Sequence, residues 1–276
     1  MIEEFITIRG LNIFTKKMGE GTPLVFLHGG PGGEHRFFLP HLEGLANQFQ
    51  LVFYDQRGCG QSEEPQDKKS YTISEEVETL EELRQKLEIK KLNLVGESWG
   101  SMLALAYASR YPKHVNRLFL TAAVGATTSG YLGFGEKLNN KLSPEDKTSF
   151  DSVVERYKKG EAEVSEIFKI LDRYYVHSPE TLERKTKTKS NAEVNQVLGQ
   201  DIIENYNQLI ILDNLREIPI LIAQGESDII TPDDLNELIV KYLPHVQIKV
   251  LSECGHWTAV EKPDVLQSMI IDYFGE

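Results

Sequence analysis

The feature that most constrains this chain is a short apolar run that ends in Gly-x-Ser-x-Gly and leads into a stretch rich in alanine and leucine. The first run covers residues 91–95, where Leu92, Leu94 and Val95 are apolar. The motif is Gly96-Glu97-Ser98-Trp99-Gly100, and the second stretch covers residues 101–106. This order is typical of a strand, an abrupt turn and a helix, with the serine at the turn. The two glycines leave space that a Cβ would fill. We therefore predict a strained turn that lifts the Ser98 hydroxyl above a sheet.

Further runs with strand character alternate with helical patterns along most of the chain. They cover residues 5–9, 11–15, 24–27, 50–54, 115–120, 219–224 and 246–251. The first two flank Gly10 as a hairpin, and the last alternates in polarity, which is typical of a strand near the edge of a sheet. Helical patterns begin near Thr72 and Pro232, and another closes the chain. The alternation predicts the α/β class, with a mostly parallel central sheet covered by helices on both faces.

Strand-like runs stop between Gly125 and about Asp213, where the pattern is polar and helical. Ser143-Pro144-Glu145-Asp146 is a favourable helix start within this region. The basic stretch of residues 183–189 is expected to be a solvated face. We predict a core in two parts, residues 1–123 and 214–276, with a helical cap at residues 124–213 between them.

Three residues with complementary chemistry follow strand-like runs, namely Ser98, Asp228 and His256. Ligands of doubly wound sheets gather at the carboxyl ends of the strands. A serine needs a base to become a nucleophile, and the base needs an orienting acid. The order Ser, Asp, His is that of α/β-hydrolases. We predict Ser98 as the nucleophile, His256 as general base and then acid, and Asp228 as the group that fixes the imidazole tautomer.

A glycine-rich loop, His28-Gly29-Gly30-Pro31-Gly32-Gly33, follows the strand predicted at residues 24–27. Such a loop can bring a backbone N–H close to a substrate carbonyl. We expect the N–H groups of Gly30 and Trp99 to form an oxyanion hole, with His28 supporting the loop. Asp55 and Arg57 are expected to tie a later polar loop together. This chemistry requires no metal and no organic cofactor.

The net charge of −12 over 276 residues disfavours binding to nucleic acid and to anionic membranes. The two cysteines, Cys59 and Cys254, give neither a disulfide framework nor a zinc pattern. The first residues lack the pattern of a signal peptide, and no apolar run reaches the ~20 residues of a membrane span. We therefore expect a cytoplasmic protein that acts on a small molecule or a short peptide. The sequence assigns no oligomeric state.

Three motifs together resemble the prolyl aminopeptidase (proline iminopeptidase) group of α/β-hydrolases, and the resemblance extends from about Leu24 to Phe274. They are His28-Gly29-Gly30-Pro31-Gly32-Gly33, Asp55-Gln56-Arg57-Gly58-Cys59-Gly60-Gln61-Ser62 and Gly96-Glu97-Ser98-Trp99-Gly100-Ser101. The resemblance implies an exopeptidase that removes an N-terminal residue, preferably proline, from short peptides. It implies the same roles for the predicted Ser, Asp and His, and for the two N–H groups.

The chain also departs from this family. Family elbows often have glycine where this chain has Glu97, and some members have glutamate after the triad aspartate, where this chain has Ile229. Acidic side chains, partly from the cap, bind the substrate ammonium in such enzymes. The best cap candidates here are Glu204, which we expect to bind the substrate, and Asp201.

Two other classes of function compete with an aminopeptidase. One is a carboxylesterase, thioesterase or lactonase of the same fold whose cap has lost the ammonium site, because this fold hosts many reactions. The other is a non-enzymatic binding protein, against which the intact Ser98, Asp228 and His256 argue. Dehalogenase and epoxide hydrolase chemistry is disfavoured, since those relatives use aspartate at the position of Ser98.

Overall fold

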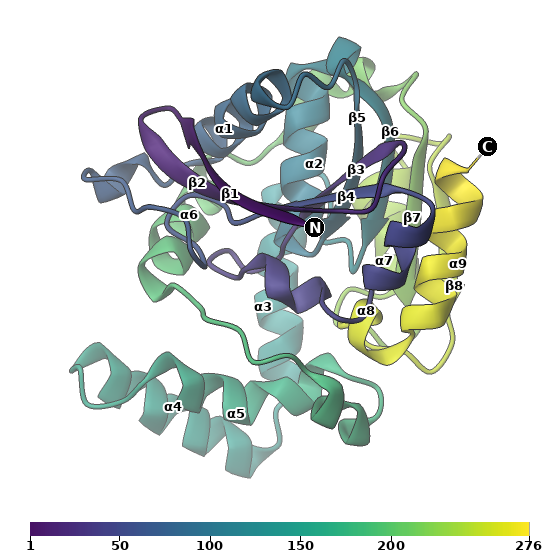
Figure 1. Cartoon of the computed structure of the whole chain (residues 1–276). Coiled ribbons are helices and arrows are strands. Elements are labelled where there is room, and N and C mark those ends of the chain that lie inside the picture. The colour runs from purple at the N-terminus through teal and green to yellow at the C-terminus, as the bar shows by residue number, and fades with distance from the viewer. Residues whose placement is uncertain (276) are drawn as a thin grey trace.

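An eight-stranded sheet forms the centre of the protein in a computed structural model, which describes residues 1–275 but not the side chains of residues 209–211 (Figure 1). The strands are β1 (Ile2–Ile8), β2 (Leu11–Met18), β3 (Pro23–Leu27), β4 (Gln50–Tyr54), β5 (Leu92–Glu97), β6 (Val115–Thr121), β7 (Ile220–Gly225) and β8 (Gln247–Leu251). Their order across the sheet is β1-β2-β4-β3-β5-β6-β7-β8. The strand β2 pairs antiparallel with β1 and β4, and the other pairs are parallel. The predicted mostly parallel sheet is confirmed.

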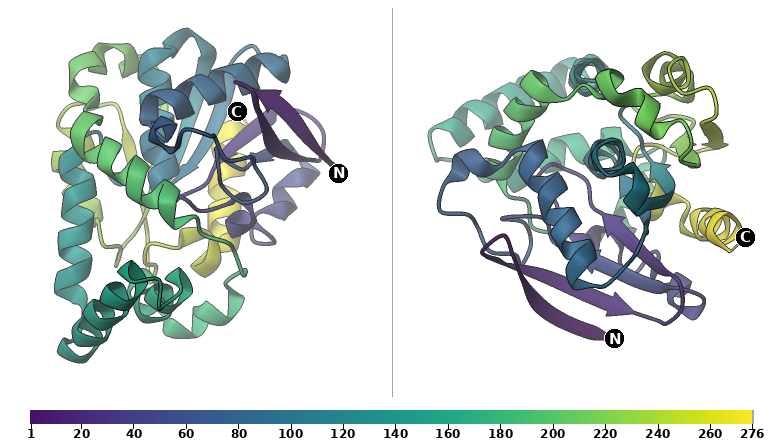
Figure 2. Two further views of the ribbon diagram at one scale, coloured as in Figure 1. Left: turned by 90° about the vertical axis from the view of Figure 1, so that its left-hand side faces the viewer. Right: turned by 90° about the horizontal axis from the view of Figure 1, so that it is seen from above.

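Helices cover both faces of this sheet, as the views in Figures 1 and 2 show. The α-helices are α1 (Ile73–Lys86), α2 (Trp99–Arg110), α3 (Thr128–Lys141), α4 (Pro144–Lys158), α5 (Val164–Tyr175), α6 (Ala192–Asn205), α7 (Pro232–Leu235), α8 (Thr258–Glu261) and α9 (Pro263–Phe274). Short 3-10 helices are η1 (His35–Phe38), η2 (Glu43–Asn47), η3 (Lys68–Ser70), η4 (Pro112–His114), η5 (Pro179–Arg184) and η6 (Gln208–Leu215). A π-helical turn, η7 (Asn236–Val240), continues α7.

Alternate residues of the central strands supply two separate cores. In β3, Val25 faces the core shared with α1 and α2, whereas Phe26 faces the core shared with α9. In β5, Leu94 likewise faces the first of these cores and Val95 the second. This division follows from the two-residue period of a strand, and it explains why the run of residues 24–27 is apolar throughout.

Several local predictions agree with the structure. The last strand, β8, lies at the edge of the sheet, and β1 and β2 form the N-terminal hairpin. The Thr72 side chain accepts a hydrogen bond from the Glu75 N–H at the start of α1. The Ser143 side chain caps α4 in the same manner. The main difference concerns β5, which extends to Glu97, so that the strand runs directly into the turn.

The helices α3 to α6 lie in the chain between β6 and β7, where the sequence predicts a cap. The pair α4 and α5 lies well away from the sheet, at the bottom of Figure 1, whereas α6 returns to contact α1 and α3. A small apolar cluster of Leu138, Leu142, Leu171 and Ile229 joins this region to the loop after β7. None of the helices in residues 1–275 is long and apolar enough to cross a membrane. The exact limits of the cap, residues 124–213, stay a prediction.

Candidate active site

Ser98 stands on the turn between β5 and α2 with a backbone conformation that L-residues rarely adopt. Its φ is 53° and its ψ is −117°. A Cβ added to Gly96 would lie 2.5 Å from the Gly100 carbonyl oxygen, and one added to Gly100 would lie 2.0 Å from that of Leu27. Only glycine fits at either position. The surroundings thus hold Ser98 in a strained state that costs about 1–3 kcal/mol.

Ser98, His256 and Asp228 form a continuous series of hydrogen bonds. The His256 Nε2 lies 2.9 Å from the Ser98 Oγ, and its Nδ1 lies 2.8 Å from an Asp228 carboxylate oxygen. With Nδ1–H donating to Asp228, Nε2 is left to accept the Ser98 hydroxyl proton. The three side chains come from the turn after β5, the loop after β7 and the loop after β8, and all are buried. The structure therefore brings together the three residues that the sequence singled out.

The environment of His256 favours a basic imidazole. Burial lowers the pKa of this side chain, but the charge of Asp228 and the hydrogen bond to it outweigh burial. The resulting pKa lies above the ordinary value of 6.5. The imidazole can therefore take a proton and remain stabilised by the neighbouring carboxylate.

Gln224, which sequence reasoning missed, holds the Asp228 carboxylate in place. Its amide nitrogen donates to Asp228 at 2.9 Å, and its amide oxygen accepts from the Ala123 N–H at 2.8 Å. The Ile230 N–H donates to the other Asp228 oxygen at 3.2 Å. The available signal was a polar residue at the end of the otherwise apolar run 219–224, because a fully buried amide needs hydrogen-bond partners.

A second missed residue, Glu261, ties the His256 loop to the cap. Its carboxylate accepts the N–H of Gly255 at 2.6 Å and the N–H of His177 at 2.9 Å. The His256 N–H itself donates to the carbonyl of Tyr175 at 2.7 Å. The position of the imidazole therefore depends on the end of α5 as well as on the sheet.

The two backbone groups predicted to bind an oxyanion lie beside Ser98. Gly30 and Trp99 line a cavity of about 380 Å³ together with Ser98. Within the described residues, neither N–H donates to a protein acceptor. Trp99 is the first residue of α2, where no carbonyl of the helix can reach its N–H. Both donors are thus available to a ligand, and their role in catalysis stays a prediction.

Side-chain hydrogen bonds join the glycine-rich loop to the elbow. The His28 Nδ1 donates to the Gly29 carbonyl, and its Nε2 accepts from the Gln56 N–H, each at 3.0 Å. The Gln56 amide oxygen in turn accepts from the Trp99 indole at 2.8 Å. The expectation that His28 supports this loop agrees with these contacts.

The polar loop after β4 is held by the charged residues that the sequence pointed to. Asp55 accepts from the N–H groups of His35 and Gln61, each at 2.9 Å. The Arg57 guanidinium pairs with Glu75 at 2.8 Å. Asp55 thus holds the loop through Gln61 and joins it to η1 through His35, while Arg57 joins it to α1, in agreement with a structural role.

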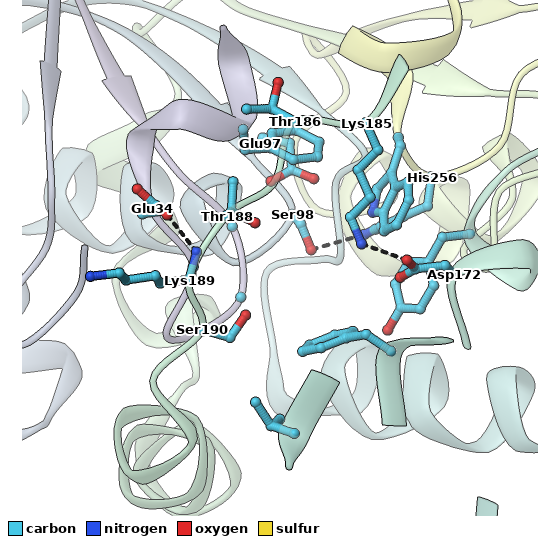
Figure 3. Close-up of a pocket in the computed structure, with 18 of the residues that line it drawn as sticks. Glu34, Glu97, Ser98, Asp172, Lys185, Thr186, Thr188, Lys189, Ser190 and His256 are labelled. Atoms are coloured by element: carbon cyan, nitrogen blue, oxygen red, sulfur yellow. Dashed lines mark hydrogen bonds and ion pairs between the residues drawn. The ribbon is translucent and has the colours of Figure 1, made fainter. Parts of the chain in front are cut away.

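Ser98 and His256 open onto a cavity of about 900 Å³ between the glycine-rich loop, α5 and the segment of residues 185–190 (Figure 3). Within the basic stretch expected to be a solvated face, Glu183, Arg184, Lys187 and Lys189 are indeed exposed, but residues 185–189 also line this cavity, which that prediction did not include. The ammonium group of Lys185 pairs with Asp172 at 2.6 Å and lies 4.3 Å from the centre of the Trp257 ring. A charged segment can enclose a cavity in this way because a lysine ammonium is attracted to the face of an aromatic ring as well as to a carboxylate.

The prediction for Glu204 as a substrate-binding residue disagrees with the structure. Its side chain is exposed and accepts a hydrogen bond from the Gln200 amide at 2.7 Å. Asn195, on the same helix, does line the cavity, but Glu204 lies about two and a half turns further along and faces the opposite side. Asp201 accepts the Ile73 N–H at 2.8 Å at the start of α1, so it has a structural partner.

This arrangement of sheet, elbow and cap matches a described family. The family model "alpha/beta hydrolase fold" matches residues 22–263, most of the chain. The chain belongs to the α/β-hydrolase family.

Proline iminopeptidases are among the relatives of this α/β-hydrolase. The enzyme of that name from Saccharolobus solfataricus is 27% identical over 295 residues, covering 99% of this chain and 92% of the relative. This confirms the resemblance stated from the motifs. The family and its relatives make this α/β-hydrolase a hydrolytic enzyme.

Solved structures with the same fold carry different names. A thermophilic esterase from Thermogutta terrifontis has a TM-score of 0.77 and 21% identity, covering 100% of this chain and 98% of that one. A proline iminopeptidase from Mycobacterium smegmatis has a TM-score of 0.71 and 19% identity, covering 99% and 97%. At these identities the likeness establishes the fold of this α/β-hydrolase and not its substrate.

Proposed function

We propose that this α/β-hydrolase is a serine hydrolase and, more specifically, a prolyl aminopeptidase that releases an N-terminal residue, preferably proline, from short peptides. The observation that carries the proposal is the hydrogen-bonded series of Asp228, His256 and Ser98 on a strained elbow that faces a cavity. The similarity to proline iminopeptidases supports the substrate class.

The proposed reaction is acyl transfer from a peptide to water. The Ser98 Oγ attacks the carbonyl carbon of the first residue while His256 Nε2 takes the hydroxyl proton, and Asp228 stabilises the imidazolium. The N–H groups of Gly30 and Trp99 bind the oxyanion, and the loss of one such donor typically lowers kcat about 10²–10³-fold. His256 then protonates the leaving amine, which gives an acyl-enzyme. Water, deprotonated by His256, releases the free amino acid.

An esterase, thioesterase or lactonase is the second candidate function. One observation favours it, because Glu204, the acid expected to bind a substrate amine, lies outside the cavity. The same three side chains would attack an ester, a thioester or a lactone through the same steps.

A substrate panel separates these functions. We would measure kcat/KM for L-prolyl p-nitroanilide, its N-acetylated form and short-chain aryl esters, with Ser98→Ala as the control for background hydrolysis. An aminopeptidase cleaves the free prolyl arylamide and leaves the acetylated form essentially intact. Turnover of esters alone would establish the second function. If none of these substrates is turned over and a fluorophosphonate does not label the protein, the chain is a non-enzymatic binding protein.

A further inference from the structure

The cavity beside Ser98 is lined by three acidic side chains, and two of them already have cationic partners. Glu34 accepts from the Arg36 guanidinium at 2.6 Å, and Asp172 pairs with Lys185 at 2.6 Å. Glu97 forms no ion pair with a lysine or arginine of the described chain. The negative charge of Glu97 is therefore the one that a positively charged group of a ligand can pair with.

Glu97 occupies a position between the nucleophile and the glycine-rich loop. It is the last residue of β5, directly precedes Ser98, and is only 4% exposed. A Cβ added to Gly29 would lie 2.1 Å from a Glu97 carboxyl oxygen and 3.2 Å from the Ser98 Cβ. Gly29 thus leaves the space that the carboxyl group fills, and Figure 3 shows this group next to Ser98.

A buried carboxylate without a cationic partner is costly to a protein. Burial raises the pKa of Glu97 to about 7. His256, Asp228 and Tyr175 are the titratable groups that face it, and none of them supplies a permanent positive charge. Strained or uncompensated groups beside reacting atoms are characteristic of functional sites, since substrate binding can offset their cost.

We propose that the Glu97 carboxylate binds the protonated α-amine of the substrate, which defines the substrate class as aminoacyl compounds with a free N-terminus. The inference rests on the proposed function. In an aminoacyl group, the amine nitrogen lies only about 2.5 Å from the carbonyl carbon that Ser98 attacks. An acid on the residue next to the nucleophile is within reach of that amine. The ammonium site is thereby assigned to the core, whereas Glu204 in the cap lies outside the cavity.

A matched pair of substrates tests this assignment. The 2-naphthyl esters of L-proline and of cyclopentanecarboxylic acid have the same ring size and differ in an ammonium group. The readout is the ratio of kcat/KM for the prolyl ester to kcat/KM for the cyclopentyl ester. Because the chemical reactivity of each ester is the same for every enzyme form, a change in this ratio between variants reports recognition of the amine.

Wild-type enzyme is expected to favour the prolyl ester, and Glu97→Gln, which keeps the shape of the side chain, is expected to lower the ratio on the order of 10²-fold. Asp172→Asn is the matched control, because it removes an acid of the same cavity that is already paired, and it should keep the wild-type ratio. Should Glu97→Gln fail to fold, Glu97→Gly is the second variant, since related elbows often have glycine there.

The assignment is overturned if the wild type shows no preference for the prolyl ester, if the Glu97 variants keep the wild-type ratio, or if Asp172→Asn loses it as well. The proposed aminopeptidase function is judged separately, by cleavage of L-prolyl p-nitroanilide. An enzyme that prefers the prolyl ester through Glu97 and does not cleave the arylamide is an aminoacyl esterase. An enzyme that cleaves the arylamide, and whose ratio of prolyl to cyclopentyl ester kcat/KM is unchanged in the Glu97 variants, is an aminopeptidase with its ammonium site elsewhere.

Discussion

At the residue scale, the candidate active site depends on buried polar side chains that surround the three predicted ones. Gln224 fixes the Asp228 carboxylate, and Glu261 ties the loop of His256 to the cap. Each supporting group is itself buried, so its hydrogen bonds form with little competition from water. The geometry of Ser98, His256 and Asp228 therefore depends on these supporting hydrogen bonds as well as on the three residues themselves.

Replacing Asp228 with asparagine is expected to lower kcat about 10⁴-fold, because an amide nitrogen facing Nδ1 selects the wrong imidazole tautomer. Steady-state kinetics with the best substrate of the panel measure this loss. Thermal unfolding of the variant serves as the control for folding. A loss below tenfold would mean that Asp228 does not orient His256.

The raised pKa of His256 sets the expected pH dependence of activity. A protonated imidazole cannot accept the Ser98 proton, so kcat/KM should rise with pH through a midpoint above 6.5. The neutral cyclopentyl ester is the substrate of choice, because its recognition does not depend on the charge of Glu97. Asp228→Asn should move the midpoint to lower pH, since it removes the charge that raises the pKa. A wild-type midpoint at or below 6.5 contradicts this assignment.

At the element scale, the elbow joins β5 to α2 through contacts that leave no room for a side chain at Gly96 or Gly100. The strand in front of the turn and the helix behind it were both predictable, because each has a clear apolar pattern. Which side of each cap helix faces the cavity was not predictable from the sequence. Periodicity shows which residues share one side of α6, but it does not show that this side carries Asn195, and not Glu204, to the cavity.

Two alanine substitutions test how tightly the elbow is packed. In Gly100→Ala the new Cβ would approach the Leu27 carbonyl oxygen to 2.0 Å, so the backbone must shift. We expect a loss of stability of about 2 kcal/mol or more. Gly133→Ala, within α3 and with no atom within 4 Å of the new Cβ, is the matched control, and it should gain about 0.5–1 kcal/mol. Urea unfolding measures both changes. Equal effects of the two substitutions would show that the turn tolerates a side chain.

At the scale of the whole molecule, the α/β class and the mostly parallel sheet were predictable, since strand and helix patterns alternate along the chain. The order of the strands in the sheet was not predictable. It depends on which strands the connecting helices bring side by side, and those strands are far apart in the sequence. The same limit applies to residues 185–190. Their charge predicts a solvated face, and Lys187 and Lys189 are exposed, but charge alone does not show that neighbouring aromatic and acidic groups hold this segment along the cavity.

One buried acid makes the stability of the whole fold sensitive to pH. Both carboxyl oxygens of Glu76 are buried without a hydrogen-bond partner, and burial raises the pKa to about 8 from an ordinary value of 4.5. The folded state therefore keeps a proton that the unfolded chain releases. Its contribution to stability is fully present below pH 4.5 and is lost as pH rises to about 8, at up to ~1.4 kcal/mol per pH unit.

Glu76→Gln should remove this loss of folding stability with rising pH. The difference in the free energy of unfolding between variant and wild type should grow in favour of the variant from pH 5 to pH 8. Urea unfolding at three values of pH measures it, and groups that titrate in both proteins cancel. A difference independent of pH would show that Glu76 has the same protonation in the folded and unfolded states.

The central claim is that His256 activates the Ser98 hydroxyl for attack. The most direct measurement is the intact mass of the protein after treatment with a fluorophosphonate, followed by peptide mapping and by the rate of labelling in His256→Gln. The account predicts one adduct per chain, on Ser98, formed at least about 10²-fold more slowly in the variant. An adduct on another residue, no adduct, or a rate unaffected by His256→Gln would contradict it.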